Sequence, residues 1–361
     1  MSGKEVCVAH QGTDRIARAL PRAALVVAAL WLSAAPAAQA QSVEQFYAGR
    51  QVKFFIGSPG GGGYDFYSRL VGRFLSRHVP GHPLFVMQNM PGAGGVIVAN
   101  YLYNIAARDG SEIGMVARGA ATQPLLDPKD RGPKYVATKF NWIGTPQQEV
   151  GLLIVRQPSR VQTIADLKSQ ELVLGGTSSV APTSYYPKLM NKLFGTKFKV
   201  VEGYKGSQEA LLALERGEVD GHSSGSSSGA LRERIAPWIK DGKVKVLAQI
   251  GLAKDHDYPD VALIAELATT DAERQVMELV FTQQVMAWPI VAPPGIPPER
   301  LKALRDGFDA TMRDAEFLAE AAQQKLVINP VSGQNIAELL DRVYATPQDL
   351  LDRVAALSAR N

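Results

Sequence analysis

A run of four glycines is the richest candidate for binding chemistry in the sequence. It lies in the loop Ser58-Pro59-Gly60-Gly61-Gly62-Gly63-Tyr64-Asp65, between an apolar run and a helical pattern. Consecutive glycines allow backbone paths closed to other residues and expose N–H groups, and a helix N-terminus favours an anion. Asp65 can cap the helix or accept a hydrogen bond from a ligand hydroxyl or amine. We expect this loop to bind an anion; a plain strand-to-helix turn is the alternative.

Three further loops combine glycine with small or hydroxyl side chains in the same strand-to-helix position. They are Gly92-Ala93-Gly94-Gly95, Gly175-Gly176-Thr177-Ser178-Ser179 and Gly203-Tyr204-Lys205-Gly206-Ser207. At the carboxyl ends of parallel strands in two lobes, such loops would face each other across a cleft. Arg118 follows an apolar run and could reach the mouth of that cleft, although an ion pair at the rim is the commoner role.

Nucleotide and metal motifs fit the sequence poorly. No lysine follows the four glycines, as a phosphate loop requires, and Asp65 stands where a dinucleotide fingerprint needs glycine. His78 and His82 have the spacing of a helical metal pair, but Pro80 and Gly81 between them prevent a helix. Asp255-His256-Asp257 is typical of a solvated loop. We expect no cofactor and no metal.

A serine hydrolase is the rival function. Gly225-Ser226-Ser227-Ser228-Gly229 matches the Gly-x-Ser-x-Gly pattern, with Asp241 and His256 downstream. A nucleophile elbow needs a strand directly before it and a helix directly after it. The polar residues 220–224 predict no core strand, so Ser227 remains the alternative rather than the main hypothesis. An adhesive or structural protein would need long β repeats, which the sequence lacks.

The N-terminus predicts an exported protein. Three arginines between residues 15 and 22 precede an apolar stretch of about 13 residues, and Ala38-Gln39-Ala40 follows. This is the order of a secretory signal peptide, and the stretch is shorter than the roughly 20 residues that span a bilayer. We predict cleavage after Ala40. Cys7, the only cysteine, would be removed with residues 1–40, which leaves no disulfide and no zinc–thiolate site.

Length and composition indicate a globular α/β protein that positions these loops. The chain has 361 residues, enough for two domains, with 46% hydrophobic and 20% charged residues. Its net charge of +4 is spread without a basic run, so we expect no nucleic acid partner. Apolar runs alternate with helical patterns, which predicts parallel sheets covered by helices. The predicted strands are 52–57, 84–89, 112–117, 150–155, 172–174, 197–201, 244–249 and 288–291.

Motifs along nearly the whole mature chain resemble the receptors of tripartite tricarboxylate transporters, the Bug family. The most specific are Arg50-x-Val-x-Phe-Phe-Ile before the four-glycine loop, and Asn89-Met90-Pro91-Gly92-Ala93-Gly94-Gly95. Others follow in the family's order: Ala107-Arg108-Asp109-Gly110-Ser111, Tyr204-Lys205-Gly206-Ser207, Gly217-Glu218-Val219-Asp220, Tyr258-Pro259-Asp260 and Ala292-Pro293-Pro294-Gly295-Ile296-Pro297. Residues 177–181 lack the later glycines of the family's second-lobe loop, and 222–229 are rich in serine and glycine. The chain therefore resembles a divergent branch.

The resemblance implies a monomeric periplasmic receptor that performs no chemistry. Its fold would be a two-lobed periplasmic binding protein of type II, a venus flytrap with two crossover strands. Lobe 1 would comprise 41–150 and 252–361, with the C-terminal helices open to either lobe, and lobe 2 would comprise 151–251. The receptor would bind a small organic acid or related metabolite and deliver it to membrane permease subunits. Its expected ligand-binding residues are Ser58, Gly61, Gly62, Gly63, Asp65, Ala93, Gly94, Arg118, Thr177, Ser178, Ser179, Ser207 and Asp220.

Overall fold

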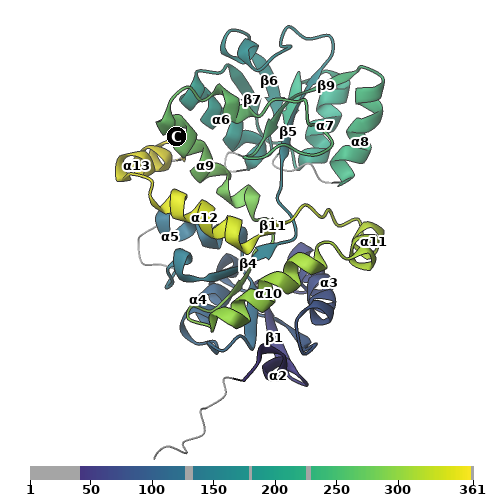
Figure 1. Cartoon of the computed structure of the whole chain (residues 1–361). Coiled ribbons are helices and arrows are strands. Elements are labelled where there is room, and N and C mark those ends of the chain that lie inside the picture. Colours follow the sequence, from purple (N-terminus) through teal and green to yellow (C-terminus); the bar gives the residue numbers. More distant parts are fainter. Residues whose placement is uncertain (1–40, 127–132, 179–180, 225–228, 359–361) are drawn as a thin grey trace, which may run out of the picture. The chain divides into compact units, whose positions relative to one another are not determined.

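Short apolar runs that end in glycine-containing turns fold into two separate β-sheets (Figure 1). The computed structural model describes residues 41–126, 133–178, 181–224 and 229–358. The predicted signal peptide, residues 1–40, lies outside the described residues. The chain from Val43 onward forms one compact unit. None of its described helices combines the length and the apolar character needed to cross a membrane.

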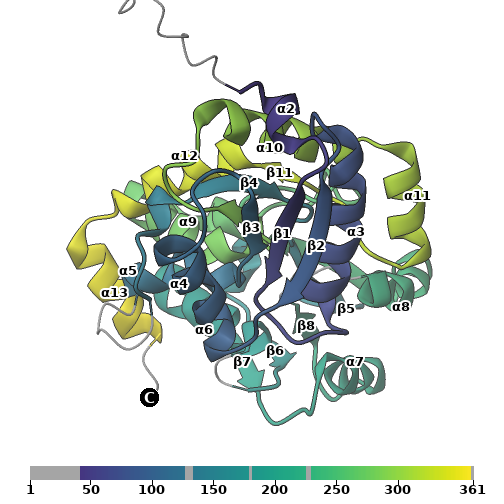
Figure 2. The same cartoon turned by 90° about the horizontal axis from the view of Figure 1, so that it is seen from below.

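The six-stranded sheet has the order β11-β4-β10-β3-β1-β2. Its first three strands in the chain are parallel, and β1 lies between β2 and β3 (Figure 2). Strand β10 returns to this sheet from the end of the chain and pairs antiparallel with both β3 and β4. The bounds of these strands are β1 Gln51–Ile56, β2 Leu84–Asn89, β3 Glu112–Met115, β4 Asn141–Thr145, β10 Ile290–Ala292 and β11 Val331–Ser332.

The five-stranded sheet has the order β7-β6-β8-β5-β9. Its strands β6, β7 and β8 run parallel, whereas β5 runs antiparallel to both of its neighbours, β8 and β9. All five strands come from one continuous part of the chain. Their bounds are β5 Gly151–Arg156, β6 Leu172–Gly175, β7 Phe198–Val201, β8 Gly221–Ser223 and β9 Val244–Ile250.

Helices cover both sheets. In the six-stranded part α3 packs on β1 and β2, and α10 packs on α3 and β4; in the other part α6, α7 and α8 pack on β7, β6 and β9. The α-helices are α2 Val43–Tyr47, α3 Gly63–His78, α4 Val96–Asn104, α5 Gln123–Leu126, α6 Pro182–Phe194, α7 Ser207–Arg216, α8 Gly229–Lys240, α9 Asp271–Val285, α10 Pro298–Thr311, α11 Ala315–Gln323, α12 Gly333–Tyr344 and α13 Gln348–Ser358. The 3₁₀ helices are η1 Ala93–Gly95, η2 Arg118–Ala121, η3 Ala137–Lys139, η4 Ala165–Lys168 and η5 Ile264–Leu267.

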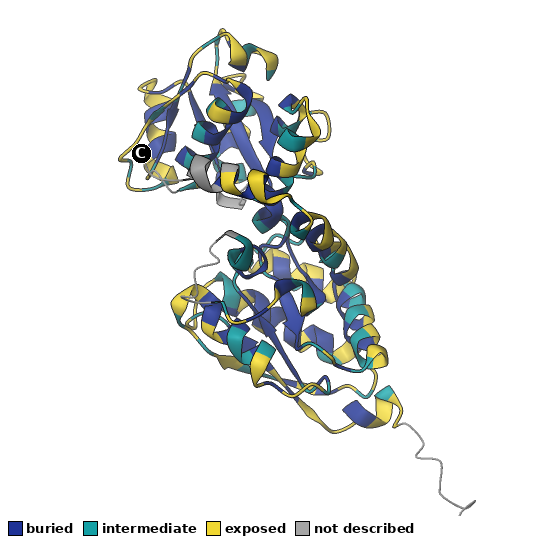
Figure 3. Ribbon diagram, turned by 90° about the vertical axis from the view of Figure 1, so that its left-hand side faces the viewer, coloured by how far each residue is buried: buried dark blue, intermediate teal, exposed yellow. Residues whose placement is uncertain are grey.

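Strand β5 shows how the five-stranded sheet becomes buried on both faces. Leu152 and Ile154 belong to a cluster with Leu211 and Ile235 of the covering helices, whereas Leu153 belongs to the cluster on the other face. Alternate residues of a strand point to opposite faces, so a strand covered on both sides is apolar at every position. Figure 3 shows buried strands within exposed outer helix surfaces.

The α/β prediction and the two sheets are confirmed, with one error that matters for the site. Residues 220–224 were expected not to form a core strand, yet β8 lies there, between β5 and β6. All three of its residues are buried, because β8 is a central strand and α6 and α7 pack against it. The lobe limits 41–150, 151–251 and 252–361 remain a prediction.

Candidate functional site

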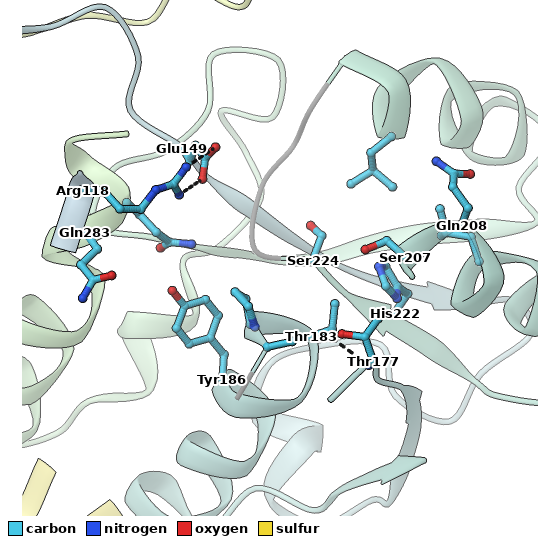
Figure 4. Close-up of a pocket in the computed structure, with 15 residues that line it drawn as sticks. Arg118, Glu149, Thr177, Thr183, Tyr186, Ser207, Gln208, His222, Ser224 and Gln283 are labelled. Carbon is cyan, nitrogen blue, oxygen red and sulfur yellow. Dashed lines mark hydrogen bonds and ion pairs between the residues drawn. The ribbon is translucent and has the colours of Figure 1, made fainter. Parts of the chain in front are cut away.

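A cavity of about 380 Å³ is lined by residues that follow strands of both sheets. Its walls carry one ion pair, several hydroxyl and amide groups and one histidine (Figure 4). Pockets of this size hold small molecules, with a few polar groups fixing their orientation.

The ion pair joins Arg118 of η2, just after β3, to Glu149, just before β5. Arg118 Nη1 donates to Glu149 Oε2 at 2.5 Å, and Nη2 donates to Oε1 at 3.3 Å. Burial lowers the pKa of Arg118, but the Glu149 carboxylate more than compensates, so the net pKa is raised and the guanidinium stays charged. The pair brings one positive and one negative charge to the cavity wall.

Tyr64 connects the four-glycine loop to Arg118. Its hydroxyl accepts a hydrogen bond from the backbone N–H of Arg118 at 3.0 Å, and its ring packs edge-on against Trp288. The Trp288 indole lies so close to Gly63 that a Cβ there would meet it at 2.5 Å. The loop therefore supports the residue that carries the positive charge of the cavity.

Two helices of the five-stranded part begin at the cavity wall. Pro182 and Thr183 open α6, and Ser207 and Gln208 open α7. Neither helix has a side-chain cap, and the first N–H groups of a helix have no acceptor within the helix. The positive ends of both helix dipoles therefore favour an anion in the cavity. Thr183 Oγ1 also accepts from the Thr177 N–H at 3.1 Å, which fixes the loop after β6.

Strand β8 and the residue that follows it contribute two polar side chains to the cavity, His222 and Ser224. The Ser224 hydroxyl is held by the backbone of Leu152, whose N–H donates to it at 2.8 Å. His222 is 0% exposed, and no described residue forms a hydrogen bond with either ring nitrogen. Burial lowers its pKa to about 4, against a smaller opposing effect of the Gly175 backbone. The imidazole is therefore neutral at neutral pH.

The predicted site residues divide into those at the cavity and those away from it. Arg118, Thr177 and Ser207 line it. Ser178 is exposed and does not line it, and Ser179 lies outside the described residues. Asp220 is also exposed, and its carboxylate accepts the Val173 N–H at 3.2 Å, which ties it to β6. The first-sheet residues that do not line this cavity are Ser58, Gly61, Gly62, Gly63, Asp65, Ala93 and Gly94.

Asp65 organises the four-glycine loop from within. It is buried and accepts from the Gly61 N–H at 3.0 Å, from Arg69 Nε at 3.0 Å and from Asn89 Nδ2 at 2.9 Å. The Arg69 guanidinium, followed by these amides, lowers the pKa of Asp65 to about 2 although burial opposes the shift. Of the four glycines only Gly61 has a left-handed backbone, with φ +85°. The expectation of a backbone path closed to other residues is therefore wrong for Gly62, at φ −104°.

Several cavity residues were missed by the sequence reasoning. They are isolated polar residues whose sequence neighbours show no motif, and only the topology brings them together. They are Glu149, Thr183, Tyr186, Gln208, His222, Ser224, Gln283 and Gln284. The one available signal was the run from His222 to Ser224, which follows the Gly217-Glu218-Val219-Asp220 motif. Its polar residues predicted no core strand, so this signal was not used.

No Ser–His–Asp triad is assembled among the described residues, and the one candidate metal group found among them is already contacted by an arginine. Strand β8 and helix α8 do flank residues 225–228, but Ser227 itself lies outside the described residues. Asp241 pairs with Lys243, and the exposed His256 pairs with Asp257. In the group Asp255, His256 and Asp257, Arg232 already contacts both carboxylates. His78 ends α3 and pairs with Asp314 at 2.9 Å instead of with His82.

Comparisons with known proteins agree with this arrangement. The family model described as tripartite tricarboxylate transporter family receptor matches residues 77–352. The UPF0065 protein in the gbd 5' region of Cupriavidus necator is 25% identical over 354 residues, which cover 93% of this chain and 96% of that protein. A TctC solute-binding protein from Polaromonas, solved without ligand, is 18% identical with a TM-score of 0.65, covering 85% of this chain and 99% of that one. R. palustris Rpa4515, solved with adipate, is 21% identical with a TM-score of 0.50, covering 85% and 97%.

Proposed function

The chain belongs to the tripartite tricarboxylate transporter receptor family, whose members are periplasmic solute-binding receptors and not enzymes. From this premise we propose that it captures a small carboxylate and delivers it to a tripartite tricarboxylate-type membrane permease. The single observation that supports a carboxylate as the ligand is that Arg118 and the uncapped N-termini of α6 and α7 meet at one cavity. Family membership also removes the reason to assign Ser227 a catalytic role.

The charges of the cavity support one bound carboxylate group. Glu149 balances Arg118, and His222 is neutral, so side chains alone leave the wall without net charge. The helix N-termini supply the remaining positive potential through backbone N–H groups, which bind a carboxylate without a counter-charge of their own. The adipate in R. palustris Rpa4515 is consistent with this class of solute.

Further parts of the proposal concern the first-sheet loops and export. The loops of the six-stranded part would contribute to the solute site through Ser58, Gly61, Gly62, Gly63, Asp65, Ala93 and Gly94. Tyr64 would couple the four-glycine loop to Arg118 through the hydrogen bond that its hydroxyl accepts from the Arg118 N–H. Residues 1–40 would direct export to the periplasm and be removed after Ala40. The permease would recognise the solute-loaded receptor.

A thermal-shift screen of the protein purified from periplasmic extract tests the proposal. The panel contains aliphatic mono-, di- and tricarboxylates, aromatic acids, amino acids and uncharged amides. A ligand at 100 times its Kd raises the free energy of unfolding by about 2.7 kcal/mol, a readily measured shift. We expect at least one aliphatic acid to stabilise the protein, and Arg118→Gln to reduce that shift.

A different pattern would contradict the proposal. Stabilisation by uncharged amides alone would show that the cavity does not select a carboxylate. No shift with any acid, together with esterase turnover that Ser227→Ala abolishes, would favour the hydrolase. Ser223→Ala serves as the control variant for handling, because Ser223 lies on β8 but does not line this cavity.

A further inference from the structure

The His222 ring lies in the cavity wall, and the described residues leave the hydrogen-bonding capacity of both its nitrogens unused. Arg118 is bound to Glu149, Thr177 to Thr183, and Ser224 to Leu152. By contrast, neither ring nitrogen of His222 has a hydrogen-bond partner among the described residues, although the side chain is fully buried. Buried polar groups are nearly always hydrogen-bonded, so a group left unpaired calls for a specific partner.

The register of β8 fixes where the His222 ring points. His222 lies opposite Ile154 of β5, and it lines the cavity together with Ser224, two residues further on. Ser223, between them, instead contacts a small apolar space with Leu153 and Met190 on the other side of the sheet. Because alternate residues of a strand face opposite sides, the ring is directed into the cavity by the sheet itself. Figure 4 shows it together with Ser207 and Gln208 of α7.

We infer that His222 is a specificity-determining residue that hydrogen-bonds a hydroxyl group of the bound acid. The inference rests on the proposed function, since it assigns the carboxylate to Arg118 and the helix N-termini, and the hydroxyl to the ring. The neutral imidazole carries one donor and one acceptor. A hydroxyl can donate or accept, so it satisfies a ring nitrogen in either tautomer.

A second carboxylate is a poorer partner for this ring than a hydroxyl. Burial keeps the pKa of His222 at about 4, so the ring offers no positive charge at neutral pH. Moving a further carboxylate to this buried position would desolvate its charge without a cation to compensate. The hydroxyl needs no such compensation, because it forms a neutral hydrogen bond.

Isothermal titration of matched acid pairs tests the inference. The probes are succinate against malate and glutarate against 2-hydroxyglutarate, each pair differing by one hydroxyl. For the full mature protein we expect the hydroxy acid of at least one pair to bind about 5- to 150-fold more tightly, the ratio that corresponds to one buried hydrogen bond. His222→Leu should remove this preference while changing the affinity for the plain acid by less than about threefold.

Two further variants keep the test decisive. His222→Gln retains a donor and an acceptor, so it should keep part of the preference, and it replaces His222→Leu if that variant fails to fold. Ser223→Ala, on the opposite face of β8, should keep the full preference. A wild-type protein that binds both members of every pair equally, or a preference that survives His222→Leu, overturns the inference alone. If neither these probes nor any other acid of the panel binds, the proposed function fails and the inference fails with it.

Discussion

Arg118 donates two hydrogen bonds to the carboxylate of Glu149 inside the candidate cavity, at 2.5 and 3.3 Å. Arg118 follows β3 of the six-stranded sheet, and Glu149 lies between β4 of that sheet and β5 of the five-stranded sheet. Glu149 therefore occupies the guanidinium edge that a carboxylate solute would use. Under the proposed function, this competition would set the free-energy cost of binding an acid, because the solute would have to share or replace a partner already in place.

Replacing Glu149 with glutamine should make the receptor bind acids more tightly. The substitution removes the competing negative charge and leaves Arg118 available, so we expect about tenfold higher affinity for succinate or adipate. The empty protein should lose about 1–2 kcal/mol of stability, since one partner of a largely buried pair is gone while Arg118 stays 31% exposed. Calorimetric titration and urea unfolding measure the two effects. Unchanged or weaker binding of both acids would show that Glu149 does not compete with the solute.

Gly62 and Gly63 should respond differently to the same small substitution. At Gly62 the backbone φ is −104° and an added Cβ meets nothing within 4 Å, so Gly62→Ala should change stability by less than about 0.5 kcal/mol. At Gly63 the Cβ would meet the Trp288 ring at 2.5 Å, so Gly63→Ala should cost about 1–3 kcal/mol and alter tryptophan fluorescence. Urea unfolding followed by fluorescence compares them.

Two substitutions of Gly62 distinguish a purely structural turn from a loop that binds the solute. If the glycine loop contributes to the solute site, Gly62→Val should weaken acid binding while the protein remains as stable as Gly62→Ala. Equal affinity of Gly62→Val and wild type for succinate and adipate would instead assign the loop a purely structural role, in which Asp65 and Arg69 hold it in place.

Much of the fold was predictable because most of its strands are apolar runs with their own boundaries. Strands β1, β2 and β5, for example, lie within a residue of the predicted ranges. Strand β8 was not predictable in this way: Gly221, His222 and Ser223 carry no apolar signal, and they are buried because the strand is central in its sheet and α6 and α7 pack against it. Strands β4 and β11 were missed as well, since both pair with strands distant in the sequence.

The site was predictable only where residues follow strand ends. Arg118, Thr177 and Ser207 each follow an apolar run, and a parallel sheet brings such positions to one edge. Glu149, Gln284 and His222 are single polar residues that meet because distant segments fold together. The ion pair and the unpaired histidine could therefore be found only in the three-dimensional structure, since no local sequence pattern encodes them.

The mature N-terminus should be Gln41. The Ala38-Gln39-Ala40 site follows the apolar stretch directly, and α2 begins at Val43, so cleavage after Ala40 leaves the first described helix intact. Intact mass spectrometry of periplasmic extract should show a chain that begins within a few residues of Gln41. A full-length form retained in the cytoplasm would contradict the assigned location.

The buried His222 should make folding sensitive to acid. Its pKa falls from an ordinary 6.5 to about 4 in the folded protein. Between these two values the unfolded chain binds a proton at His222 and the folded chain does not. Stability is therefore lost as pH decreases below about 6.5, and the loss is complete near pH 4, where the folded form also becomes protonated. The total loss of stability approaches about 3 kcal/mol.

His222→Gln does not titrate, so its free energy of unfolding should decrease less over the same range. Urea titrations of both proteins between pH 7 and 4 measure the difference. A difference independent of pH would mean that the ring accepts its proton in the folded state as readily as in water, and hence that burial does not lower its pKa in the cavity.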